Sequence, residues 1–85
     1  MEVYYKPSFV KQYAGLEPEL QEEVKDKIRL FKDKKNHRQL KVHKLKGHLE
    51  GCYSFSVNYR YRIVFRYLSQ NEAALLAIGD HDVYK

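Results

Sequence analysis

The chain has 85 residues, of which 44% are hydrophobic and 32% charged, and its formal net charge is +5. This length allows one small domain with one core, which we place at residues 1–85, and excludes a second domain. A single cysteine, Cys52, excludes an internal disulfide. The N-terminal residues lack the apolar region of a signal peptide, and no run is long enough to span a bilayer, so we expect a cytoplasmic protein.

The positive charge is concentrated in one stretch, residues 32–46. This stretch has seven cations against one acid, so it alone carries a net charge of +6. The seven cations are Lys32, Lys34, Lys35, Arg38, Lys41, Lys44 and Lys46. A basic band on a chain that is otherwise close to neutral indicates a polyanionic or acidic partner.

The first third of the chain predicts a short strand and two helices. Residues 3–5 (VYY) form the strand, which ends before Pro7. Pro7 then begins a helix that Gly15 ends, and Pro18 begins a second helix. The apolar residues of the second helix follow at spacings of four, four and three, which is one helical stripe. They are Leu20, Val24, Ile28 and Phe31. Two such helices in tandem form a hairpin that needs a sheet to cover.

The rest of the chain predicts strands. The basic connector, residues 36–51, has weak periodicity and can hold a short strand or a turn. Residues 52–57 alternate between polar and apolar side chains, Asn58 and Tyr59 form a turn, and residues 60–67 alternate again. After the polar turn 69–72, the apolar run 73–78 is typical of a central strand buried on both sides. The order is β-α-α-β-β-β, which predicts an α+β fold with an antiparallel sheet and the helical hairpin packed on one face.

The alternation also predicts which side chains face the helices. One set points toward them: Tyr53, Phe55, Tyr61, Ile63, Phe65 and Tyr67. The other set lies on the uncovered face: Ser54, Ser56, Arg62 and Arg66. The arginines are therefore expected on the open side of the sheet, close to the basic connector.

The histidines and the cysteine do not match known metal or nucleophile patterns. His43 and His48 are five residues apart with no carboxylate between them, which is no recognised ligand spacing. We therefore expect no metal and no other cofactor. Cys52 begins a strand two residues before Ser54, so we interpret it as a small packing residue rather than a nucleophile.

The remaining candidates are cations and imidazoles. Cleaving RNA without a metal requires a base for the 2′-hydroxyl, a cation for the charge that develops on the phosphate, and an acid for the leaving oxygen. His43, Arg62 and His81 fit these three roles, and Lys44 and Lys46 fit contacts to flanking phosphates. Composition and spacing alone favour the alternative that these residues belong to a solvated loop, an ordinary strand surface and a C-terminal tail.

Several motifs resemble the RelE/ParE superfamily of bacterial and archaeal toxins. They lie in "HKLKGHLEGCYSFSVNYRYRIVFRY" and "LLAIGDHDVYK", which together run from His43 to the end of the chain. The family has an LKG…G-x-Y segment, a YR[IL]V[YF] strand and a last strand that ends in G-x-[HR], with a tyrosine just beyond. All four features occur here in the family's order.

The resemblance implies the toxin of a type II toxin–antitoxin pair, whose antitoxin wraps around it. Members similar to YoeB and YafQ are metal-independent endoribonucleases, most of which cut mRNA in the ribosomal A site. By this resemblance Arg62 is the transition-state arginine, His43 the general base and His81 the general acid. Tyr84 matches a terminal aromatic residue that orients the substrate.

One departure from the family bears on the mechanism. RelE itself has lysines on the strand where this chain has Ser54 and Ser56. The lysine base of RelE is therefore absent, and the pair His43 and His81 favours acid–base catalysis of the YoeB and YafQ kind.

The hypothesis is thus a ribosome-dependent mRNA endoribonuclease that leaves a 2′,3′-cyclic phosphate. We expect five cations to contact RNA: Lys41, Lys44, Lys46, Arg60 and Arg66. The expected partners are an acidic antitoxin, mRNA and the ribosome, with a monomer when free and a hetero-oligomer with the antitoxin. The alternatives are a ParE-like toxin that inhibits DNA gyrase, and a protein of the same fold that only binds antitoxin or rRNA.

Overall fold

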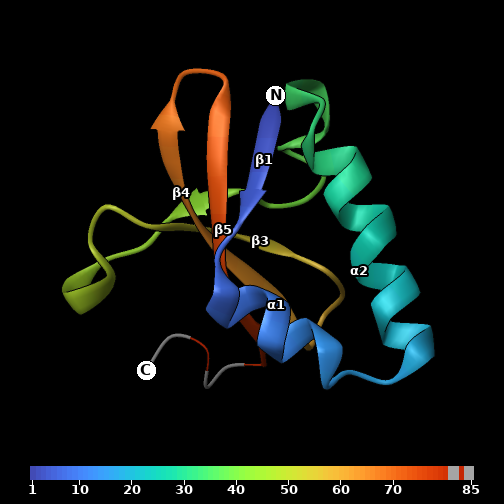
Figure 1. Cartoon of the computed structure of the whole chain (residues 1–85). Helices are drawn as coiled ribbons and strands as arrows, with labels where there is room; N and C mark the ends of the chain where they lie inside the picture. The colour runs from blue at the N-terminus through green and yellow to red at the C-terminus, as the bar shows by residue number, and fades with distance from the viewer. Residues whose placement is uncertain (81–82, 84–85) are drawn as a thin grey trace.

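The computed structural model describes residues 1–80 and 83. Within these residues, two helices, two 3-10 turns and five strands follow one another (Figure 1). They are β1 (Glu2–Tyr5), α1 (Pro7–Ala14), α2 (Pro18–Phe31), η1 (Lys34–Asn36), β2 (His43–Lys44), η2 (Gly47–Leu49), β3 (Tyr53–Ser56), β4 (Arg62–Ser69) and β5 (Glu72–Gly79). The prolines stand at the first positions of both helices, as predicted.

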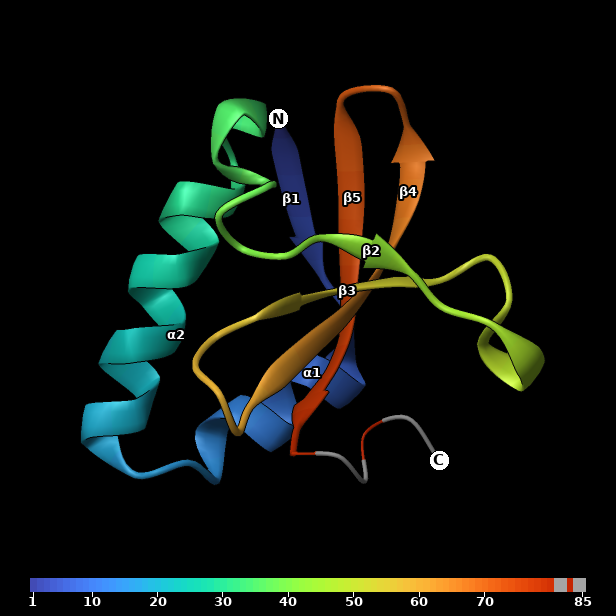
Figure 2. The same cartoon turned by 180° about the vertical axis from the view of Figure 1, so that it is seen from behind.

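The five strands form one sheet in the order β1-β5-β4-β3-β2. The α+β class and the element order are confirmed, and the connector contributes the short strand β2 beside β3 (Figure 2). The sheet is mixed rather than wholly antiparallel, because β1 pairs in parallel with β5, with Glu2 opposite Glu72 and Tyr5 opposite Leu75. Alternation within a strand indicates which face each side chain occupies but not which neighbour the strand chooses, so the sequence did not reveal the parallel partner of β1.

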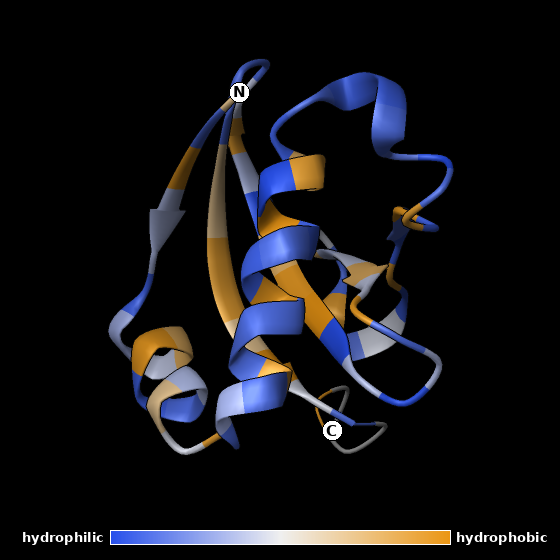
Figure 3. Ribbon diagram, turned by 90° about the vertical axis from the view of Figure 1, so that its right-hand side faces the viewer, coloured by the Kyte–Doolittle hydropathy of each residue, from blue (hydrophilic) through white to orange (hydrophobic). Residues whose placement is uncertain are grey.

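Both helices cover the same face of the sheet. The buried side chains that they contribute to the core are Phe9 from α1 and Val24, Ile28 and Phe31 from α2. Figure 3 shows hydrophilic residues along the outward side of α2 and hydrophobic ones on the strands behind it. This is the amphipathic pattern that the stripe of α2 predicts.

Phe31 lies at the centre of this core and is fully buried. Its ring stacks on Phe55 of β3, with 4.3 Å between ring centroids, and meets Phe65 of β4 edge-on at 4.7 Å. The ring of His37 stacks on it at 4.7 Å, and His37 Nε2 lies 2.7 Å from the Phe31 carbonyl oxygen. The end of α2 is thereby held against two strands and the start of the connector.

The predicted faces of β3 and β4 are confirmed on the helix side, where Phe55, Ile63 and Phe65 are completely buried. The other face differs from expectation, because Ser54 is also fully buried and Val64 is only 3% exposed. Neighbouring side chains cover this part of the face, among them His43 on β2, which reaches Ser54. β4 begins at Arg62 rather than at residue 60, and residues 57–61 form the loop that joins it to β3.

The apolar run 73–78 is a strand inside the sheet, as predicted. β5 lies between β1 and β4, and the successive residues Ala73, Ala74 and Leu75 are all buried. Burial of consecutive residues means that both faces of this strand are covered. Within the described part of the chain, no helix has the length and the apolar character needed to cross a membrane.

The packing of Phe31 leads to a stability prediction. Replacement of Phe31 by alanine removes a fully buried ring that contacts two strands, and we expect it to lower the free energy of unfolding by about 3–5 kcal/mol. The control is Leu68→Ala, because Leu68 is 55% exposed, and there we expect a change below about 0.5 kcal/mol. Urea denaturation followed by circular dichroism measures both; similar losses in the two variants would contradict the central place of Phe31.

Candidate functional site

The open face, defined as the side of β3 and β4 that points away from the helices, brings two of the predicted catalytic residues together. The strand register sets His43, Ser54 and Val64 in one row across β2, β3 and β4. Ser56, Arg62 and Gly79 form the next row across β3, β4 and β5. His43 and Arg62 are therefore two strands and two residues apart, which is about 10 Å across the sheet and about 7 Å along it.

The hydrogen bonds of His43 define its tautomer. Nδ1 lies 2.9 Å from the carbonyl oxygen of Lys41, and a carbonyl oxygen only accepts, so Nδ1 carries the proton. In the neutral ring Nε2 then has the lone pair, and it accepts a hydrogen bond from the hydroxyl of Ser54 at 3.4 Å. The His43 residue is exposed. An exposed imidazole that holds the proton on Nδ1 and presents Nε2 toward the open face has the arrangement that a general base needs.

The backbone of Lys41 adopts an unusual conformation to make this contact. Its φ angle is +59°, the left-handed region that residues other than glycine rarely occupy. The neighbouring Leu40 is buried, and its carbonyl oxygen accepts a hydrogen bond of 2.9 Å from the Ser56 amide. The anchored Leu40 therefore supports a strained residue whose carbonyl orients His43. Such strain costs about 1–3 kcal/mol per residue and is concentrated at functional sites.

Arg62 is half-buried and its orientation is set by the loop before it. Nη1 donates hydrogen bonds to the carbonyl oxygens of Asn58 and Tyr61. Nε and Nη2 make no hydrogen bond to any other residue in 1–80 or to residue 83. These two nitrogens form one edge of the planar guanidinium, and this edge has the geometry that binds a phosphate through two parallel hydrogen bonds.

The other predicted RNA contacts lie in several places around this face. Arg66 is exposed, with Nη2 4.0 Å from the sulfur of Cys52, and Arg60 packs over the ring of Tyr61 at 5.4 Å. Lys44 follows His43 on β2 and pairs with Tyr53, so its side chain belongs to the opposite face. Lys41 and Lys46 are exposed on either side of β2.

Two predicted catalytic residues, His81 and Tyr84, lie outside the described residues. Gly79, two positions before His81 in the sequence, ends β5 in register with Arg62.

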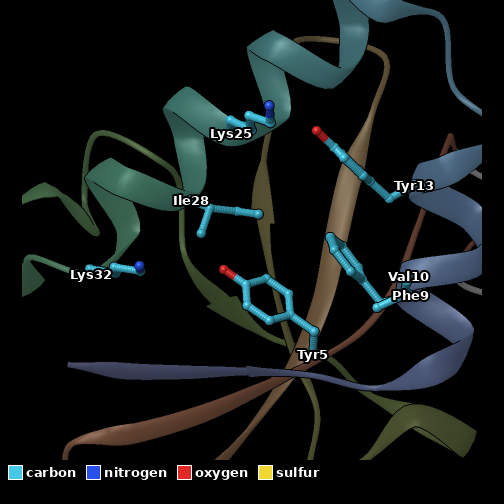
Figure 4. Close-up of a pocket in the computed structure, with 7 residues that line it drawn as sticks. All are labelled: Tyr5, Phe9, Val10, Tyr13, Lys25, Ile28 and Lys32. Atoms are coloured by element: carbon cyan, nitrogen blue, oxygen red, sulfur yellow. The ribbon is translucent and has the colours of Figure 1, made fainter.

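The structure offers little chemistry elsewhere. Among residues 1–80 and 83, no three His, Cys, Asp or Glu side chains lie close enough together to hold a metal ion. Cys52 is buried, in agreement with a packing role. An apolar hollow of about 330 Å³ lies between α1 and α2 (Figure 4). Its lining is aromatic and aliphatic apart from Lys25 and Lys32, so it contains no acid–base pair.

Sequence analysis did not identify the backbone and side-chain groups that hold the candidate residues. Ser54 touches His43, the Lys41 carbonyl orients it, and Asn58 carries the loop that binds Arg62. An asparagine at the start of a predicted turn is a signal for Asn58, because its side chain can accept hydrogen bonds from amides just ahead in the chain. The sequence carries no comparable signal for Lys41.

The same fold occurs in the solved structures of several bacterial toxins. A YoeB/ParE toxin from Agrobacterium tumefaciens matches with a TM-score of 0.69 and 20% identity, covering 95% of this chain and 99% of that one. A YafQ mutant from E. coli has a TM-score of 0.72 at 15% identity, with coverages of 98% and 96%. The toxin of a heterotetrameric YoeB–YefM toxin–antitoxin complex from Staphylococcus aureus has a TM-score of 0.64 at 20% identity, with coverages of 95% and 97%.

The family itself is shown by sequence. Residues 18–85 match the model of the ParE-like toxin domain, so the chain belongs to the ParE-like toxin family. The resemblance to the RelE/ParE superfamily is thereby confirmed. No curated protein matches the chain in sequence.

The contact between His43 and Lys41 predicts the tautomer in solution. When the His43 ring is neutral, we expect long-range ¹⁵N–¹H spectra to show its proton on Nδ1, because the Lys41 carbonyl can only accept a hydrogen bond. Lys41→Gly keeps the left-handed conformation and should leave the tautomer unchanged. Lys41→Pro forces a negative φ and should release the ring. A proton on Nε2 in the wild-type protein would remove His43 from the role described here.

Proposed function

We propose that this member of the ParE-like toxin family is the toxin of a type II toxin–antitoxin pair and that it cuts mRNA on the ribosome without a metal ion. The observation that carries the proposal is the open face: His43, whose unprotonated Nε2 accepts only a 3.4 Å contact from the Ser54 hydroxyl, lies two strands and one row of the sheet from Arg62. The Nε and Nη2 edge of Arg62 has no partner in residues 1–80 or 83. We take residues 1–85 as one toxin domain, because β1 and α1, which precede the family match, pack on the same sheet. Its proposed place of action is the cytoplasm, where mRNA is translated.

The proposed reaction is a transfer within the RNA backbone. His43 Nε2 removes the proton of a 2′-hydroxyl, and the oxygen attacks the adjacent phosphorus while the bond from phosphorus to the 5′-oxygen breaks. Arg62 binds the phosphate oxygens, on which negative charge increases in the transition state. His81 donates a proton to the leaving 5′-oxygen, and Tyr84 orients the substrate. The products are a 2′,3′-cyclic phosphate and a 5′-hydroxyl, so no water is consumed in this step.

The surrounding cations would bind the rest of the RNA. Lys41, Lys46, Arg60 and Arg66 lie around the open face and fit contacts to flanking phosphates, which position the chain without reading its sequence. Lys44 lies on the other face of β2 and fits a contact to rRNA or to the antitoxin better than one at the cleaved phosphate. The basic band also fits an acidic antitoxin, and a toxin–antitoxin complex is the form of one solved relative.

A second candidate function comes from the family match, whose description is ParE-like. Such a toxin would inhibit DNA gyrase and cut no RNA. The set formed by His43, Arg62 and His81 favours the ribonuclease, because a gyrase inhibitor needs no base and no acid. The fold is compatible with both functions.

Replacement of Arg62 tests the proposal directly. We expect Arg62→Ala to lower the cleavage rate about 10²–10³-fold, since the variant loses the charge that stabilises the transition state. Arg62→Lys keeps the charge but loses the edge that makes two parallel hydrogen bonds. Its cleavage rate should lie between those of wild type and Arg62→Ala. The measurement is single-turnover cleavage of 5′-labelled mRNA on ribosomes, and the matched control is Arg29→Ala, which removes an exposed arginine of α2 paired with Asp26. Growth arrest with DNA breaks and no new mRNA ends would establish the gyrase function instead.

Replacement of His43 tests the base. We expect His43→Ala to lower the same rate about 10²–10⁴-fold, the usual contribution of a general base. The control is His48→Ala, which removes an exposed imidazole outside β2. Equal activity in the two variants would exclude His43 as the base.

The absence of metal chemistry is testable on the same substrate. We expect protein that has been stripped of bound metal with EDTA, and then freed of the chelator, to cut ribosome-bound mRNA as fast as untreated protein, and added zinc or manganese to bring no increase in rate. The new RNA ends should carry a 2′,3′-cyclic phosphate, because the nucleophile belongs to the substrate. A 5′-phosphate end would contradict the proposed chemistry, since it requires attack by water or a metal-bound hydroxide.

A further inference from the structure

The loop between β3 and β4 is fixed by its second residue, Asn58. The side-chain oxygen Oδ1 accepts hydrogen bonds from the amides of Arg60, at 2.9 Å, and Tyr61, at 2.8 Å. Asparagine is well suited to this arrangement because its short side chain reaches amides two and three residues ahead. The Val57 amide closes the loop with a hydrogen bond of 3.0 Å to the Tyr61 carbonyl.

The same side chain also ties the loop to a helix. Asn58 Nδ2 donates a hydrogen bond of 2.8 Å to Glu23 Oε1 on α2, 35 residues earlier in the chain. Asn58 and Glu23 are both half-buried. Val24 and Ile28 of the same helix are buried in the core. The position of Glu23 is therefore fixed, because α2 cannot shift without disturbing the core packing.

The loop in turn sets the guanidinium of Arg62. Nη1 donates hydrogen bonds to the carbonyl oxygens of Asn58 and Tyr61. The Asn58 side chain holds the segment between these two residues, because its Oδ1 accepts a hydrogen bond from the Tyr61 amide. A change in the loop therefore moves both acceptors together and turns the free edge formed by Nε and Nη2.

We propose that Asn58, anchored by Glu23, is a positioning residue for Arg62, and that helix α2 thereby holds the phosphate-binding edge in place. The inference rests on the proposed function, because it assigns to Arg62 the reacting phosphate. Asn58 itself does not touch the substrate. Its effect comes from orientation, and a displacement of about 1 Å at a reacting group can cost about 100-fold in rate.

The chemistry of the pair allows an exchange of partners. Asn58→Asp keeps an oxygen for the two loop amides but sets two carboxylates against each other, and we expect the cleavage rate to fall about tenfold. Glu23→Gln keeps an acceptor for the Asn58 amide and should stay within about twofold of wild type. The double variant Asn58→Asp with Glu23→Gln exchanges the carboxylate and the amide, so the hydrogen bond re-forms and the rate should recover.

The matched control is Asn58→Asp combined with Glu22→Gln. Glu22 is the neighbouring carboxylate of α2, exposed and paired with Lys25 at 3.1 Å, so its replacement removes the same charge from the helix without re-forming the hydrogen bond. We expect no recovery in this variant. Recovery equal to that of the Glu23→Gln pair would show that general charge, rather than the contact, is responsible.

Coupling to Arg62 separates positioning from a loss of stability. In single-turnover cleavage of ribosome-bound mRNA, Asn58→Ala should lower the rate about 10–100-fold in the wild-type background. It should have no further effect in Arg62→Ala, since the residue it positions is gone. Rate losses that multiply in the double variant would overturn the proposal, because a structural defect acts whether or not Arg62 is present.

A measurement without RNA keeps the inference distinct from the proposed function. The Arg62 side-chain Nε–H signal, followed by ¹⁵N relaxation, should be ordered in wild type and mobile in Asn58→Asp, and ordered again in the exchange variant. Unchanged order in Asn58→Asp would overturn the positioning role even if the rate falls. If wild type cuts no mRNA, or Arg62→Ala cuts as fast as wild type, the proposed function fails, and with it the link to catalysis.

Discussion

The contact on which the rest of this structure depends is the ring stack of Phe31 on Phe55, with Phe65 at its edge. The three rings come from α2, β3 and β4, so one cluster sets the angle and the distance between the helix and the two central strands of the candidate site. Glu23 stands eight residues earlier on the same helix and contacts the loop that joins those strands. The packing of Phe31 fixes the position of helix α2. Because α2 is rigid, this packing also fixes where Glu23 can contact Asn58 in the loop.

The same packing divides the sheet into two faces with different physical roles. The helix side is dry and supplies stability. The open face is polar, yet between His43 and Arg62 its floor is made by Ser54 and Val64, which are 0% and 3% exposed. A partly dry floor screens charges less than bulk water does, so an arginine there interacts more strongly with a phosphate than the exposed lysines of the basic band. In the proposed function the band would attract RNA over a distance, and the open face would make the specific contact.

The sequence was sufficient for features that depend on local pattern. The stripe of α2, the prolines at both helix starts and the alternation of Phe55, Ile63 and Phe65 each follow from one periodicity, and the structure has them as predicted. The parallel pairing of β1 with β5 and the hydrogen bond from Asn58 to Glu23 join residues far apart in the chain, and no local pattern encodes such a choice. The left-handed backbone conformation of Lys41 could not be predicted from the sequence either, because lysine has no preference for it.

Three arginines occur within seven residues of one strand and its loop, and their surroundings separate them. Arg60 stands in the loop against a tyrosine ring, and Arg66 is exposed beside a sulfur atom. Only Arg62 of the three has one nitrogen committed to two backbone carbonyls while the opposite edge of its guanidinium has no partner in residues 1–80 or 83. An arginine held in this way has already lost most of its rotamer freedom on folding, so binding a phosphate costs it less entropy than it costs a free side chain. A charge that is oriented before the substrate arrives is also the form in which electrostatic groups contribute most to a transition state, because nothing has to reorganise during the reaction.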